Sequence, residues 1–158
     1  MADTIGAAAA AVLLTADPAE KARLSRHHAA RWHAGELAAV YDVPMPDRPS
    51  RPARPELLPP SRMPKRGRAG SERSRIALLH ALAHIEFNAI DLAWDAAGRF
   101  GGAMPRAFTD DWVAVADDEA RHFMLLADRL ADPGAAYGGL PAHDGPWGAA
   151  MATADDLP

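Results

Sequence analysis

The chain has 158 residues, of which 49% are hydrophobic, and this is enough for one domain with a buried core. It contains no cysteine, which excludes disulfides, iron–sulfur ligation and thiolate chemistry, and its formal net charge of −4 at pH 7 argues against nucleic-acid binding by the protein as a whole. Alanine supplies much of the hydrophobic content, and the β-branched alternation that is typical of strands is missing. We therefore predict an all-α fold.

Residues 1–41 are predicted to form two short helices, over residues 4–15 and 18–37. The break between them is marked by Asp17, a good N-cap, and by Pro18, which suits the first position of a helix. We expect these helices to pack beside a larger bundle.

The apolar run at residues 7–14 is predicted to be part of the fold. It follows Asp3 rather than the basic stretch of a signal peptide, and it is too short to cross a bilayer. The absence of cysteine fits a reducing compartment. We therefore expect a soluble, cytoplasmic protein with no membrane segment.

Residues 42–70 are predicted to be an extended strap rich in proline and arginine. Eight of the fourteen prolines lie here, so neither helix nor sheet can persist, and their three-residue spacing matches the polyproline II turn. Between Arg48 and Arg75 there are nine Lys or Arg residues against two Glu. Such a segment could contact nucleic-acid phosphates, but we favour a solvated surface wrap that balances acidic helices.

Residues 71–132 are predicted to form a hairpin of two long antiparallel helices. The first begins after the N-cap Ser71. Glycines and a proline accumulate over residues 98–109, which are therefore expected to be a loop. The second helix is expected to begin after Thr109 as its N-cap.

Three candidate metal ligands fall on the apolar stripes of this hairpin: Glu86 on the first helix, and Glu119 and His122 on the second. The stripes comprise Ile76, Leu79, Ala83, Ile90 and Ala97 on the first helix, and Trp112, Val115, Ala116, Phe123, Leu126 and Leu130 on the second. Buried carboxylates are unfavourable unless they are paired or bound to metal. The pattern therefore indicates a metal site.

Glu86 and Glu119 are expected to meet at the same height of the hairpin. Facing residues of an antiparallel hairpin are equally far from the turn, and the midpoint of these two lies between Gly102 and Ala103, inside the predicted loop. Glu119 and His122 form an i, i+3 pair whose side chains project the same way. Carboxylate and imidazole ligands suit iron or manganese, and zinc also fits.

Two other assignments stay open. Glu86 could form an ion pair with Arg75 or Arg121 instead of binding metal. His80 and His84, spaced i, i+4 just before Glu86, are second-tier candidates, either as metal ligands or as groups that orient the ligands.

Four stretches of the chain resemble a bacterial ferritin-like family of unassigned function. The central ones are HALAHIEFNAIDLAWD at residues 80–95 and DDEARHF at residues 117–123. The segments at residues 15–21 and 137–147 look similar too. The resemblance therefore covers nearly the whole chain.

The wider ferritin-like superfamily includes ferritins, rubrerythrins, carboxylate di-iron oxygenases and a tRNA-modifying hydroxylase. The resemblance implies a four-helix bundle around two metal ions, expected to be iron, with manganese or zinc as alternatives. It further implies that Glu86 is the ligand of the first helix, that Glu119 bridges the metals and that His122 binds one of them.

The second half of the ligand set that this resemblance implies is absent from the 158 residues. No other glutamate has a histidine three residues further on; the others are Glu20, Glu36, Glu56 and Glu72. Residues 133–158 are rich in glycine and proline, and a third helix is expected to start near Trp147. We therefore expect an incomplete bundle, completed either by a missing C-terminal half or by a second copy in a homodimer.

The leading functional hypothesis is a di-iron oxidoreductase or hydroxylase of unknown substrate that here lacks half of its ligands. A tRNA substrate would give the basic strap a use, but only by analogy. The alternatives are an iron-handling ferroxidase or storage protein, and a non-catalytic helical scaffold without metal.

Overall fold

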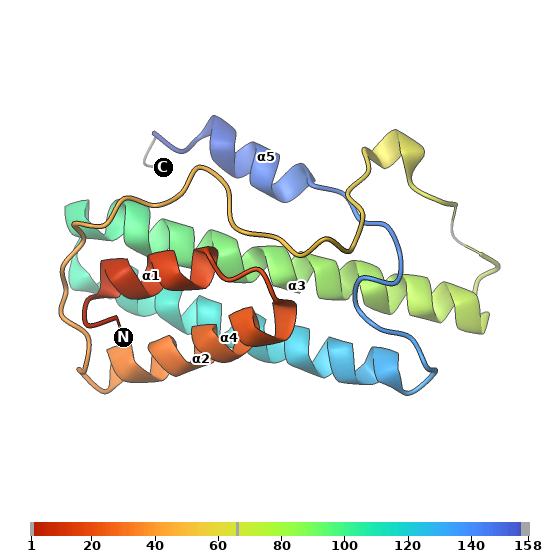
Figure 1. Cartoon of the computed structure of the whole chain (residues 1–158), viewed down its shortest axis with the longest axis horizontal. Coiled ribbons are helices and arrows are strands. Elements are labelled where there is room, and N and C mark those ends of the chain that lie inside the picture. Colours follow the sequence, from red (N-terminus) through yellow and green to blue (C-terminus); the bar gives the residue numbers. More distant parts are fainter. Residues whose placement is uncertain (1, 66, 156–158) are drawn as a thin grey trace.

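The computed structural model describes residues 2–65 and 67–155 and confirms the all-α fold. Within these ranges it has no β-strand, and two long antiparallel helices, α3 and α4, form its largest unit (Figure 1). The helices are α1 (Ile5–Leu13), α2 (Pro18–His33), α3 (Glu72–Phe100), α4 (Arg106–Ala131) and α5 (Gly145–Ala152), with short 3₁₀ turns η1 (Pro60–Arg62) and η2 (Gly101–Ala103).

Helix α3 is the central helix and contacts α1, α2, α4 and α5. Ser71 caps it as predicted, because its hydroxyl accepts a hydrogen bond of 3.1 Å from the backbone N–H of Ser74. Trp94 ties α3 to α2 by donating from Nε1 to the Ser25 hydroxyl at 2.7 Å. By length and composition alone Glu72–Ala103 could also span a bilayer, a test that core helices of soluble proteins pass as well, and 44% of the tested window is buried.

The turn between α3 and α4 is shorter than predicted, and the assignment of Thr109 as an N-cap is wrong. Helix α4 begins at Arg106, and Thr109 is buried inside it with its Oγ1 2.7 Å from the Tyr41 hydroxyl. The N-cap is Pro105, whose ring fixes φ near the observed −57°. The guanidinium of Arg106 lies 4.1 Å from the centre of the Trp32 ring, which stabilises the additional turn.

Helix α2 ends at His33, four residues before its predicted end. Gly35 adopts φ +76°, a left-handed conformation that glycine accepts without strain. Its N–H donates to the carbonyl of Trp32 at 3.0 Å, and the N–H of Glu36 donates to that of Arg31 at 2.9 Å. This pair of hydrogen bonds is a Schellman motif, so the glycine terminates the helix.

Residues 42–70 contain no α-helix in their described part and follow α3 closely (Figure 1). Two of their arginines contact acidic groups. Arg48 pairs with Asp144, and Arg51 lies 3.7 Å from Asp91 with its side chain 15% exposed. The arginines thus balance acidic groups, but Arg51 does so in a largely buried position instead of a solvated one.

A buried ion pair holds α2, α3 and the strap together. The Lys21 ammonium lies 2.5 Å from the Asp91 carboxylate, and both side chains are fully buried. The ammonium also donates to the carbonyls of Leu13 and Ser50, at 3.3 and 3.2 Å. Burial raises the pKa of Asp91 to about 6, although Lys21 and Arg51 oppose the shift. Removing one partner of such a pair typically costs about 3–5 kcal/mol.

Candidate metal centre

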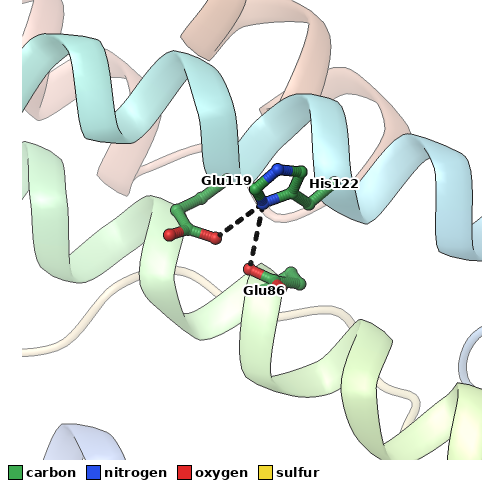
Figure 2. A group of neighbouring side chains, drawn as sticks. All are labelled: Glu86, Glu119 and His122. Atoms are coloured by element: carbon green, nitrogen blue, oxygen red, sulfur yellow. Dashed lines mark hydrogen bonds and ion pairs between the residues drawn. The ribbon is translucent and has the colours of Figure 1, made fainter.

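Glu86, Glu119 and His122 converge between the two long helices and are called the carboxylate cluster below (Figure 2). The Nδ1 atom of His122 lies 3.4 Å from Oε2 of Glu119 and 3.9 Å from Oε2 of Glu86. One ligand atom from each residue can be chosen so that all lie within 4.8 Å of one another. The structure therefore brings together the three residues that the spacing argument selected.

The local structure explains why these side chains meet. The 3₁₀ turn η2 contains the midpoint of Glu86 and Glu119, so both residues lie at the same height of the hairpin. The next residue after Glu86 is Phe87, and the next after His122 is Phe123. The rings of Phe87 and Phe123 are buried and pack 5.4 Å apart between centroids. This contact fixes the rotation of each helix and aims the preceding side chains to one side of the interface.

The carboxylate cluster is half-buried on an open, apolar face of the hairpin. The side chains of Glu86 and Glu119 are each 24% exposed, and that of His122 is 41% exposed. Large apolar side chains are exposed on the same two helices: Leu78, Leu82 and Ile85 on α3, and Trp112 and Val115 on α4. Polar ligands thus lie within a surface that is otherwise suited to packing against further helices.

The prediction that Trp112 and Val115 belong to the buried stripe of α4 is wrong, because these side chains are 36% and 37% exposed. Ala116, Phe123 and Leu130 are buried as predicted, and Val113 and Ala120 are buried as well. Two adjacent stripes of α4 both have helical spacing. The first packs against α2 and α3, and the second carries Glu119 and His122 on the open face. Sequence periodicity alone does not separate them.

The charged form of Glu86 is disfavoured in the carboxylate cluster. Burial first, and then the proximity of Glu119, raise the pKa of Glu86 to about 7. Among the described residues, His122 is the ion-pair partner of both Glu86 and Glu119. A cation placed between the carboxylates would relieve this repulsion.

The alternative pairing of Glu86 with an arginine is not found among the described residues. Arg121 instead lies 3.5 Å from Asp118, and its guanidinium approaches Nε2 of His122 at 3.3 Å. A guanidinium can only donate, so Nε2 accepts. The other ring nitrogen, Nδ1, faces the carboxylates and in this tautomer carries the ring proton, which must leave this nitrogen before a metal can bind there. Arg75, the other candidate partner, is exposed.

The donor atoms fit a transition metal. Oxygen and nitrogen ligands bound at about 2.1 Å lie about 3 to 3.4 Å apart when they are neighbours on one ion. The contacts of 3.4 and 3.9 Å are close to this spacing and too long for strong hydrogen bonds. Three donors from one side leave coordination positions open toward the apolar face. Further donors would have to come from that side to complete the coordination of an ion.

His80 and His84 lie outside the carboxylate cluster, against the segment 137–143. The Nε2–H of His84 donates to the carbonyl of His143 at 2.9 Å, and its Nδ1 accepts from the hydroxyl of Tyr137 at 2.8 Å. Nε2 of His80 accepts from the N–H of Gly138 at 3.0 Å. The two histidines thus hold this loop on α3. The loop and its tyrosine were missed as partners because no local pattern links them to α3.

Residues 14–158 match the sequence model of a family described as "Protein of unknown function (DUF455)". A curated protein of Haemophilus influenzae, described as an uncharacterized protein, is 40% identical over an alignment of 156 residues that covers 92% of this chain and 54% of the relative. The chain thus spans about half the length of that relative. No solved structure gave a significant match.

Proposed function

Since the chain belongs to the DUF455 family of proteins of unknown function, we propose its function from the site: it is an oxidoreductase whose Glu86, Glu119 and His122 hold iron as half of a di-metal centre. The observation that carries this proposal is the convergence of two carboxylates and one imidazole on an otherwise apolar face. Manganese and zinc suit the same donors.

The ligand pattern supports a ferritin-like centre. In di-iron bundles of this kind, two helices each supply a Glu and two others each supply a Glu-x-x-His pair. Here α3 supplies Glu86, and α4 supplies the pair Glu119 and His122. One further helix pair of the same kind would complete the set. This second helix pair comes either from a second copy of this chain or from additional sequence. The relative from Haemophilus influenzae is longer than this chain and contains such additional sequence.

The chain's own residues have distinct roles in this proposal. Bound iron would supply reactivity toward dioxygen. Glu86 and Glu119 both face Nδ1 of His122, so the three side chains would hold an ion together (Figure 2). Glu86 loses its proton to solvent when a cation binds. The exposed apolar side chains around the cluster exclude water once a second helix pair covers them.

Calorimetric titration of the purified chain with Co²⁺, Mn²⁺ and, without oxygen, Fe²⁺ tests the metal site. We expect wild type to bind the metal and Glu119→Gln to bind it at least about 100-fold more weakly. This loss of affinity exceeds the loss expected on replacing a residue that merely orients a ligand. Asp118→Asn is the matched control, since this exposed neighbour points to Arg121 and should bind normally. Equal binding by Glu119→Gln and wild type, or no binding by wild type, would refute the proposal.

Two further measurements address the reaction and the missing ligands. Added Fe²⁺ should oxidise faster in air with wild type than with Glu119→Gln, and equal rates would contradict an oxidoreductase centre. Sedimentation with and without metal identifies the second helix pair. A metal-dependent dimer with one ion per chain indicates a second copy, whereas metal binding by a monomer would show that the three residues of one chain suffice to hold an ion.

A further inference from the structure

A cavity of about 760 Å³ lies along α3, between this helix, the strap residues 60–65 and 67, and the loop at residues 140–143. Its size falls within the range of about 300 to 1,000 Å³ that is typical of small-molecule sites. The loop that closes one side is held by the hydrogen bonds from His80 and His84 described above. The cavity is therefore built by three separate segments of the chain.

The walls of the cavity are mostly apolar. The strap contributes Met63 and prolines, α3 contributes Ile76, and the loop contributes Leu140. Ile85 of α3 lines the cavity too and borders the open face of the hairpin. Ala77, also on α3, leaves room for a ligand along the helix because its side chain is short. Apolar walls of this kind recognise a hydrocarbon body rather than a sugar or a nucleotide.

One end of the cavity is basic. Lys65 and Arg73 line it beside the first turn of α3, where the helix dipole adds partial positive charge. Glu72 lies at the same end, so these three side chains carry a net charge of +1. Lys65 and Arg73 belong to the segment from Arg48 to Arg75, which has nine basic residues against two acidic ones. A negative group is favoured here.

We propose that this cavity binds a free long-chain carboxylic acid, with its alkyl chain along α3 and its carboxylate beside Lys65 and Arg73. The site uses none of the three residues of the carboxylate cluster, so it stands without the metal. The hydrocarbon provides most of the affinity, and the basic end sets the orientation and selects the charge of the head group.

Calorimetry with the whole chain and the saturated fatty acids octanoate, decanoate and dodecanoate tests the ligand class. Affinity should rise along the series by up to about fourfold for each methylene buried. Dodecanoate should bind more tightly than dodecylammonium and dodecanol of the same chain length. Equal affinities for the three head groups, or no dependence on chain length, would overturn the proposal.

Two pairs of variants locate the site. Ala77→Trp fills the cavity and should weaken dodecanoate binding more than tenfold, whereas Ala114→Trp, at an exposed position of α4, should not. Arg73→Glu should weaken binding about fivefold, as expected for losing an exposed ion pair, whereas Arg75→Glu, exposed on the same helix, should have no effect.

Wild-type affinity in both Ala77→Trp and Arg73→Glu would show that fatty acids bind elsewhere, for example on the open face of the hairpin. Because Arg73 is exposed, its variant remains informative if the tryptophan prevents folding. Co²⁺ titration of the same variants separates the two proposals. We expect Arg73→Glu to bind metal as wild type does. A negative result for fatty-acid binding would therefore leave the metal proposal untouched, and a negative result for metal binding would leave the fatty-acid proposal untouched.

Discussion

Replacing Glu86 with glutamine should stabilise the metal-free protein and abolish its metal binding. Glutamine keeps the shape of the side chain but removes the charge that faces Glu119. The two carboxylates have oxygens within 4.8 Å of each other. Two unit charges at this distance repel by about 3 kcal/mol at an effective dielectric constant of 20 and by about 1 kcal/mol in water. Since each side chain is about a quarter exposed, we expect a gain of about 1 to 3 kcal/mol at pH 8.

The stability gained by Glu86→Gln should increase as the pH rises. The pKa of Glu86 is raised to about 7 in the folded protein, above its value in the unfolded chain of about 4.3. Its proton therefore stabilises the fold at low pH, and this stabilisation is lost as the pH rises through 7. Glutamine does not titrate. The difference between Glu86→Gln and wild type should thus be largest at pH 8 and small below about pH 5.

Thermal and urea unfolding at several pH values with a chelator measures this effect. The expected rise in Tm at pH 8 is about 2 to 10 °C for a chain of this size. Glu56→Gln, the same change at an exposed position of the strap, should leave the pH dependence unchanged. A loss of stability in Glu86→Gln at pH 8, or metal affinity equal to that of wild type, would refute the reasoning.

Three other predictions test the fold and the site. Lys21→Met leaves Asp91 buried without its partner and should lower the free energy of unfolding in urea by about 3–5 kcal/mol. The double variant Lys21→Met, Asp91→Leu should recover most of this stability. Equal losses in the single and double variants would contradict the buried ion pair. Gly35→Ala should lose about 1–2 kcal/mol because φ is +76°, unlike Gly148→Ala, which lies inside α5 with open space around it. Calorimetric affinity for Co²⁺ should rise from pH 6 to pH 8, because Glu86 must lose a proton on binding, and a constant affinity would show that Glu86 is not a ligand.

The convergence of the carboxylate cluster could be predicted because it depends on regular geometry. The rise per residue of an α-helix is constant, so counting from a short turn places Glu86 opposite Glu119 even when the helix ends are misjudged. The position of Thr109 could not be predicted in the same way. Its sequence context suits an N-cap, but Pro105 starts the helix earlier and Tyr41 takes the hydroxyl as a tertiary partner.

Partners far apart in sequence account for most of what the sequence analysis missed. Lys21 and Asp91 are separated by 70 residues, and no local pattern indicates that they pair. The spacing of His80 and His84 shows that they share a face of α3, but not that the loop carrying Tyr137 covers it. The choice between two stripes of α4 likewise depends on which neighbouring helices are present.

Anomalous X-ray diffraction at the iron absorption edge, from crystals of the protein loaded with Fe²⁺ without oxygen, is the most direct test of the metal proposal. We expect an iron peak between Glu86, Glu119 and His122, within bonding distance of all three, and no such peak in crystals of Glu119→Gln. Iron bound at another place, or no peak at this position in fully loaded wild-type crystals, would contradict it.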